Sequence, residues 1–148
     1  MNKQWGWLVL AASVALAGCG EDKNGPVYQR KQIFKQMLKT REALQGMLNE
    51  RTSYNAAYFL ELSRELDAST RRPWPLFTEL HEGDKTHAKA EVWADAQSFK
   101  AAQDTMMSAT QALVTAATGK PSDKGQLRAP FSRVEQSCKQ CHDRFRVD

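Results

Sequence analysis

The sequence has little of several features that would indicate a particular class of protein. Its 148 residues include only three cysteines, too few for a disulfide scaffold. Five prolines and eight glycines exclude a linker-rich or collagen-like chain. The 21 Lys and Arg residues exceed the 17 Asp and Glu residues by only four, and they form no dense basic stripe of the kind that binds nucleic acid. A single globular domain remains, and each cysteine needs its own explanation.

The longest apolar run lies at the start of the sequence, from Trp5 to Ala17. It is shorter than the stretch of about 20 apolar residues that spans a bilayer. Lys3 precedes it and supplies a positive charge, as in secretory signals. We therefore expect this segment to direct export into an oxidising compartment.

The apolar run ends in Leu16-Ala17-Gly18-Cys19, which resembles the lipobox of bacterial lipoproteins. This resemblance implies a signal peptide over residues 1–18, a lipid-bearing Cys19 with a polar tether over 19–25, and a folded domain over 26–148. Gly20 follows the cysteine in place of aspartate, which by the same resemblance favours the outer membrane, on its periplasmic side. The alternative is an ordinary signal cleaved nearby, with Cys19 incidental.

From residue 26 onward, apolar residues recur with helical spacing and never alternate. The positions expected to face inward are Ile33, Phe34, Met37, Leu38, Leu44, Met47 and Leu48 in the first helix; Ala57, Tyr58, Phe59, Leu62 and Leu66 in the second; Val92, Ala96, Phe99, Met106, Leu113 and Ala116 in the third; and Leu127, Phe131, Val134, Cys138, Cys141 and Phe145 in the fourth. We expect Thr52 or Ser53 to cap the second helix and Gly119 to end the third. Pro130 either begins the fourth helix or kinks it. Four amphipathic helices of this length predict an all-α protein, an antiparallel four-helix bundle. The helices are expected over about 26–49, 53–69 and 90–118, and from Leu127 or Pro130 to near the C-terminus.

Residues 71–89 are predicted to form a loop, because Pro73 and Pro75 each lack a backbone donor and restrict the residue before them. Several side chains of this loop are too apolar for a purely solvated segment, so we expect them to fold back onto the bundle. They are Trp74, Leu76 and Phe77.

The sequence Cys138-Lys139-Gln140-Cys141-His142 is a C-x-x-C-H motif, the attachment signature of c-type haem. The two cysteines are three residues apart, so they share one helical face and both thiols can reach one porphyrin edge. His142 is then available as an axial ligand of the iron. The motif therefore predicts one covalent haem c near the end of the fourth helix.

Three other interpretations of the motif are a structural disulfide, a thioredoxin-like redox pair and half of a zinc site. A thioredoxin motif opens a helix within a fold that contains β-strands, and no strand pattern lies nearby. A zinc site needs a second pair of ligands, and only His81 and His87 remain, both in the loop, where we expect them to be solvated. Haem attachment uses all three motif residues.

A C-x-x-C-H motif at the end of a four-helix chain resembles cytochrome c′, the class II c-type cytochromes. The resemblance spans about residues 26–146. The chain differs from the family in a longer connection over 120–126 and in Gln29, where tyrosine usually precedes the arginine. The segments that carry the resemblance are Tyr28 with Arg30–Leu48, Pro73-Trp74 with Phe77, Ala90–Lys100 and Cys138–Arg146.

In that family, the residue four positions after the first-helix arginine covers the haem face opposite the histidine. The matching residues here are Arg30 and Phe34, and a phenyl ring cannot ligate iron. The resemblance thus implies a five-coordinate, high-spin haem that cycles between redox states and binds nitric oxide and carbon monoxide. Met37 lies three residues further on. If the protein is instead a low-spin electron-transfer cytochrome, Met37 is the candidate sixth ligand of the iron. Otherwise it is a residue of the core.

The family also suggests roles for two arginines. Arg30 is expected to pair with a haem propionate, for which a bidentate guanidinium is well suited. Arg146, four residues after the histidine, is expected in the proximal pocket. The alternative for each is a solvated surface charge, and at a helix C-terminus such a charge also favours the helix dipole.

We do not expect an enzyme. Covalent haem would consume both thiols, and a peroxidase needs a polar acid–base pair where Phe34, Met37 and Leu38 are predicted, which leaves at most weak peroxidase activity. The expected partners are nitric oxide or carbon monoxide and an unidentified redox protein, with membrane contact only through the lipid and no nucleic acid. The resemblance also implies a homodimer through the first two helices, with Tyr54 and Phe59 lying either at that dimer surface or in the core.

Overall fold

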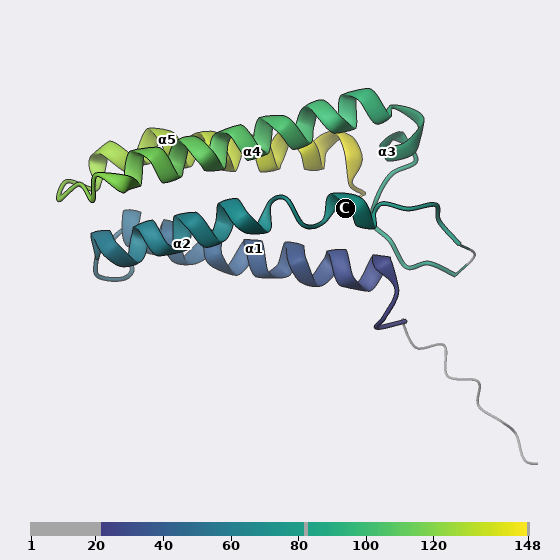
Figure 1. The fold of residues 1–148 in the computed structure, drawn as a ribbon, viewed down its shortest axis with the longest axis horizontal. Helices are drawn as coiled ribbons and strands as arrows, with labels where there is room; N and C mark the ends of the chain where they lie inside the picture. Colours follow the sequence, from purple (N-terminus) through teal and green to yellow (C-terminus); the bar gives the residue numbers. More distant parts are fainter. Residues whose placement is uncertain (1–21, 82, 148) are drawn as a thin grey trace, which may run out of the picture.

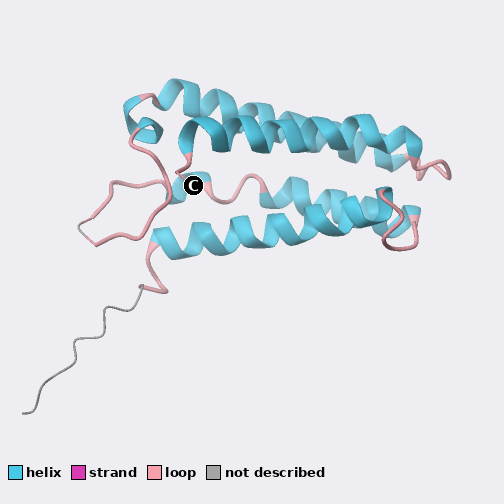
Figure 2. Ribbon diagram, turned by 180° about the vertical axis from the view of Figure 1, so that it is seen from behind, coloured by secondary structure: helices cyan, strands magenta, loops and turns pink. Residues whose placement is uncertain are grey.

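The computed structural model describes residues 22–81 and 83–147, and its four long helices form two antiparallel pairs (Figure 1). Seen from behind, the described part of the chain contains helices and loops but no strand (Figure 2). This architecture confirms the all-α four-helix bundle. The predicted signal and Cys19 lie outside the described residues. The long helices are α1 (Pro26–Leu48), α2 (Ala56–Ser69), α4 (Ala96–Thr118) and α5 (Gly125–Phe145), with a short α3 (Glu91–Ala94) and a 3-10 turn η1 (Trp74–Leu76).

Helix α1 begins at Pro26, as predicted, whereas the predicted start of α2 is wrong by three residues. Asn55 caps α2, and its side-chain oxygen accepts a hydrogen bond from the Tyr58 amide at 2.9 Å. The residues before it turn back onto α1: the Thr52 amide donates to the Gly46 carbonyl at 3.2 Å. The Arg51 amide donates to the same carbonyl at 2.9 Å, so this turn joins the two helices and Asn55, in place of Thr52 or Ser53, caps α2.

The third predicted helix is two helices, because the chain bends at Asp95 (φ −126°, ψ 59°). The Asp95 carboxylate caps α4 by accepting from the Ser98 amide at 3.2 Å, which stabilises a new helix start inside the apolar repeat. Helix α4 ends at Thr118, as expected, but the left-handed residue beyond it is Lys120 (φ 47°) and not Gly119.

Helix α5 begins at Gly125, whose amide donates to the Asp123 carboxylate at 2.7 Å. Pro130 lies inside this helix and does not start it. The predicted stripe faces inward on α5: Leu127, Phe131, Val134 and Phe145 are buried, and Cys138 and Cys141 are half-buried.

The core lies between the two helix pairs, and most predicted inward positions are confirmed. Tyr58 is 50% exposed, and Ala57 and Ala96 are exposed too, so the predicted inward orientation of these three residues is wrong; Leu60 is buried instead. Leu38 on α1 is also exposed. Phe59 is fully buried, so of its two expected positions the core is the correct one. Tyr54 is half-buried and donates to the Pro121 carbonyl at 2.7 Å.

The loop after α2 folds back as predicted, and it lies at the same end of the bundle as the C-terminus (Figure 1). Trp74 and Leu76 pack against the core. Trp93 donates its indole N–H to the Thr78 carbonyl at 3.0 Å and ties the loop to α3. Within residues 22–81 and 83–147, no helix has the length and apolar character of a membrane span.

Candidate haem site

A cavity of about 400 Å³ opens within the bundle at the end that carries the loop and the C-terminus. Apolar side chains from α1, α2, α4 and α5 form most of its wall. The seven residues predicted to attach the haem, ligate its iron, cover its open face or pair with its charges line this cavity, and Cys19 lies outside the described residues. The seven are Arg30, Phe34 and Met37 on α1, Cys138, Cys141 and His142 on α5, and Arg146 just after α5.

The two thiols at the cavity wall are free and half-buried. Burial raises the pKa of Cys138, and burial together with the neighbouring Cys138 raises the pKa of Cys141 to about 11. Both are therefore neutral thiols at pH 7. A thiol oxidoreductase needs a cysteine of lowered pKa, so this environment argues against that alternative.

His142 lies at the cavity wall with part of its side chain exposed. Loss of water lowers its pKa, and the positive charge of Arg146 lowers it further against the opposing effect of Asp143. The imidazole is thus neutral near pH 7, with a lone pair available to a metal. Among the described residues, no three His, Cys, Asp or Glu side chains gather in a way that could hold a metal ion, so the zinc interpretation finds no support there.

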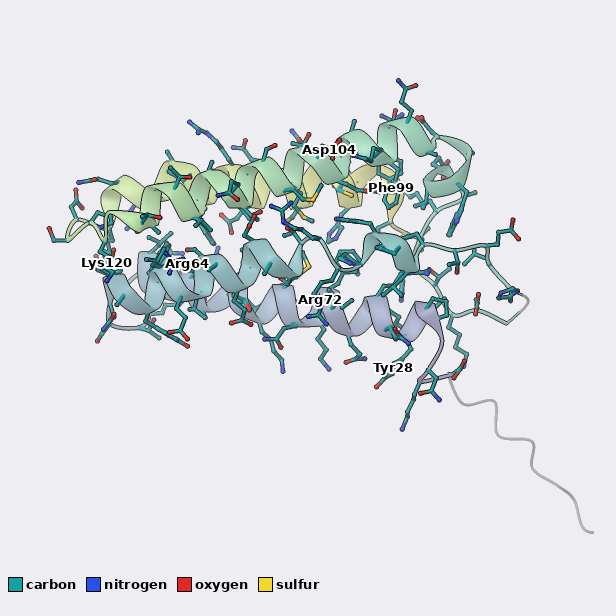
Figure 3. All side chains as sticks on the ribbon, in the orientation of Figure 1. Tyr28, Arg64, Arg72, Phe99, Asp104 and Lys120 are labelled. Carbon is teal, nitrogen blue, oxygen red and sulfur yellow. The ribbon has the colours of Figure 1, made fainter. Side chains whose placement is uncertain are left out.

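Phe34 forms part of the α1 wall of the cavity and is half-buried. Its ring meets Trp74 edge-on at 5.9 Å and Phe77 at 6.3 Å between centroids. This aromatic cluster continues through Phe99, which lies on α4 (Figure 3), to Phe145 on α5. Such contacts each contribute about 0.5–1.5 kcal/mol beyond burial, so Phe34 is held in place.

Met37 also lines the cavity, but only 6% of it is exposed and it packs within the main core. Packing accounts for this position without a role as an iron ligand.

Arg30 is only 3% exposed, so it is not a surface charge. Its guanidinium donates to the Leu76 carbonyl at 2.8 Å and to the Thr86 hydroxyl at 2.7 Å, and it lies 4.6 Å from the centre of the Phe77 ring. Burial lowers its pKa and Asp84 opposes this, yet an arginine remains charged. Arg30 therefore holds the loop against α1 and places a positive charge at the cavity, a structural role that the sequence did not indicate.

Two buried N–H groups at the cavity have no hydrogen-bond partner: the indole Nε1 of Trp74 and Nε of Arg41. A buried donor without an acceptor costs about 1–3 kcal/mol, so such groups are rare in a complete structure. Arg41 also forms an ion pair with Glu135 on α5, at 3.0 Å. An apolar cavity with two thiols on its wall, and with unsatisfied donors on two of the residues that line it, fits a flat apolar cofactor that carries carboxylates, as haem does.

The chain after α5 closes this end of the cavity. The Val147 amide donates to the His87 carbonyl at 2.8 Å, and the Lys89 amide donates to the Phe145 carbonyl at 2.9 Å. This short antiparallel contact holds Arg146 at the cavity beside the loop. His87 is exposed as predicted, although it also lines the cavity. Neither the contact nor its effect on Arg146 was apparent from the sequence.

Comparison with known proteins agrees with the fold and the cavity. The family model described as Cytochrome C' matches residues 25–146. Cytochrome c′ of Cereibacter sphaeroides is 30% identical over 142 residues, which cover 93% of each chain. Cytochrome c′ of Rubrivivax gelatinosus is 42% identical over 65 residues, so that match spans 44% of this chain and about half (49%) of the relative.

Solved structures are similar over most of this chain. A nitric oxide complex of a cytochrome c′ variant from Alcaligenes xylosoxidans has a TM-score of 0.75 at 28% identity, and covers 84% of this chain and 98% of its own. A carbon monoxide complex of another variant from that organism has the same TM-score and identity, with coverage of 83% and 94%. The chain therefore belongs to the cytochrome c′ family and is a haem protein whose cofactor is covalent haem c.

Proposed function

We propose that Cys138 and Cys141 attach the haem and that His142 is the axial ligand of its iron, which has no sixth ligand from the protein. The main evidence is that the residues able to bind haem and iron line the cavity from one helix, whereas a residue unable to ligate iron lines it from another. The motif residues line it from α5, and Phe34, which has no ligating atom, lines it from α1. When bound, the haem supplies an iron with an open position for a small neutral ligand such as nitric oxide or carbon monoxide.

The side chains around that position favour such ligands over dioxygen. Phe34, Met37 and Leu38 offer no hydrogen-bond donor from their side chains, so a ligand that needs polar stabilisation gains nothing from them. Phe34 must turn aside to admit a ligand and lose contacts with Trp74 and Phe77. The similar structures with nitric oxide and carbon monoxide support the same class of ligand for this chain.

The residues also support the two arginine roles. Arg30 has five N–H donors and uses two of its nitrogens toward the loop, which leaves donors for a propionate. The Trp74 indole, on another residue that lines the cavity, is a further donor without a partner. Arg146 is held at the cavity close enough to lower the pKa of His142, in accord with a place in the proximal pocket. The iron would cycle between ferric and ferrous states without catalysing turnover.

The ferrous holoprotein is expected to show a broad high-spin Soret band that changes when carbon monoxide or nitric oxide is added, because its iron would have an open position. Ferric and ferrous absorption spectra, recorded before and after each gas, make the measurement. Sharp, split low-spin bands that carbon monoxide leaves unchanged would instead indicate a sixth protein ligand, with Met37 as the candidate.

We also propose that the protein sits on the periplasmic side of a bacterial outer membrane through a lipid on Cys19, on the basis of the lipobox-like sequence before it. Intact mass spectrometry of the membrane-extracted protein is expected to show an N-terminus at Cys19 that carries acyl chains. An unmodified N-terminus elsewhere, in protein released without detergent, would contradict the anchor.

A further inference from the structure

The chain just before α1 is folded into a turn, which brings the bundle close to the proposed lipid on Cys19. The Gly25 amide donates to the Asp22 carbonyl at 3.1 Å, and the Gln29 side chain donates to the Asn24 carbonyl at 2.7 Å. The turn belongs to the bundle, so only three residue steps separate Asp22 from Cys19. Because three extended steps span about 11 Å at most, a lipid on Cys19 would hold Asp22 within that distance of the membrane interface.

The same end of the bundle carries the loop after η1 and the chain after α5 (Figure 1). Arg30 of α1 binds the loop through the Leu76 carbonyl and the Thr86 hydroxyl. The Val147 amide donates to the His87 carbonyl at 2.8 Å, which joins the end of the chain to the same loop. The start of α1, the loop and the end of the chain are thus bonded into one unit, which we call the loop end.

Two large apolar side chains are exposed at the loop end. Leu80 in the loop and Val147 after α5 are each 43% exposed, and neither lines the haem cavity. Single exposed apolar side chains are ordinary on a protein surface. These two, however, lie where the short connection to Cys19 would bring the chain to the membrane, and a lipid interface can bury them.

The exposed charges of the turn before α1 and of the loop have both signs. Among the described residues, Lys23 and Lys85 are set against Asp22, Glu79 and Asp84. A surface of mixed charge has no strong attraction to anionic lipid, which favours clusters of Lys and Arg. A contact at the loop end would therefore depend on the anchor and on apolar burial, and would need no anionic lipid.

We propose that the loop end rests on a zwitterionic phospholipid surface, with Leu80 and Val147 buried in its headgroup region. The proposal rests on the lipid anchor at Cys19 argued under the proposed function. It places the haem cavity, which lies at the same end of the bundle, next to the bilayer. A small apolar gas dissolved in the lipid would then reach the cavity without first crossing the aqueous compartment.

Acetylation of lysines tests the contact, because sulfosuccinimidyl acetate does not cross membranes and modifies amines that water can reach. Lys85 reports on the loop end, and Lys120, also exposed, reports on the opposite end of the bundle (Figure 3). The lipidated holoprotein is compared in phosphatidylcholine vesicles and in detergent solution, and peptide mass spectrometry gives both modification rates. Vesicles are expected to slow Lys85 at least about threefold relative to Lys120.

Leu80→Asp is expected to weaken the contact, because an ionised carboxylate is not buried in an apolar boundary without a partner. On vesicles, the rate at Lys85 relative to its rate in detergent should rise at least about twofold. Tyr58→Asp is the matched control, since it replaces an exposed apolar side chain of α2 that is not part of the loop end. It should leave the ratio unchanged. Circular dichroism and the ferrous spectrum verify that each variant is folded and holds its haem.

Flotation of the same vesicles separates this proposal from the anchor on which it rests. Protein that does not float with the vesicles has no lipid anchor, which overturns both. Protein that floats while Lys85 stays as reactive as in detergent keeps the anchor and overturns the contact, as does equal protection of Lys85 and Lys120. Protection that persists in Leu80→Asp would come from the anchor alone and would overturn the apolar contact.

Discussion

Replacing Cys138 and Cys141 together by serine is expected to yield a chain that carries no covalent haem and folds poorly. Serine cannot form the thioether bonds that the two thiols would supply. The apolar cavity of about 400 Å³ would then lose the group that fills it. At about 24 cal/mol per Å³ of closed void the upper limit of the cost is on the order of 10 kcal/mol, and water that enters from the open side lowers it. The total stability of a domain is about 5–15 kcal/mol, so the bundle depends on its cofactor.

The measurement combines haem staining of a denaturing gel with far-ultraviolet circular dichroism of the purified protein. The control is Gln140→Ser, which introduces the same residue at an exposed position between the two cysteines. The control should keep its haem through denaturation and its full helical signal. A double-serine variant that retains haem through denaturation would contradict attachment at these residues, and a stably helical apoprotein would contradict the dependence on the cofactor.

The helices were predictable because burial on one face of a helix imposes a repeat on the sequence. The stripe on α5 from Leu127 to Phe145 is continuous over five turns, and the structure buries it as expected. The helix ends were less predictable where the expected cap residue forms a hydrogen bond elsewhere in the turn. Thr52 bonds back to α1, so Asn55 becomes the cap of α2.

The break at Asp95 shows how a local contact overrides a repeat. Val92 and Phe99 both face inward, so spacing alone predicts a continuous helix. The carboxylate of Asp95 caps α4 by accepting from the Ser98 amide, and it also binds Arg144 on α5, 49 residues away. Neither this cap nor its partner on α5 follows from the spacing of the apolar residues.

The site, too, has a part that the sequence predicts and a part that it does not. The haem-attachment motif is local, because two cysteines and a histidine within five residues must share one face of a helix. The environment of Arg30 is not local, since its partners Leu76 and Thr86 come from a loop more than 40 residues away. The unsatisfied indole of Trp74 likewise becomes recognisable only when the surrounding side chains are in place.

Phe34→Ala is expected to speed the association of carbon monoxide with the ferrous holoprotein about 30-fold. In the native protein, the ring must leave its contacts with Trp74 and Phe77 before a ligand can enter. Two edge-to-face contacts of about 0.5–1.5 kcal/mol each give a cost of about 2 kcal/mol, and each 1.4 kcal/mol corresponds to a factor of ten. Alanine removes this cost from the association step. Flash photolysis or stopped-flow mixing with carbon monoxide measures the rate.

Tyr58→Ala is the matched control, because it truncates an exposed aromatic residue of α2 outside the cavity, and its rate should stay within about twofold of the parent. An unchanged rate in Phe34→Ala would mean that another group limits access or that Met37 already occupies the iron. The ferrous spectrum separates these outcomes, since Met37 ligation gives a low-spin haem. A faster rate with a high-spin spectrum would support an open position beneath Phe34, because truncating the ring removes an obstruction from the path of the incoming ligand.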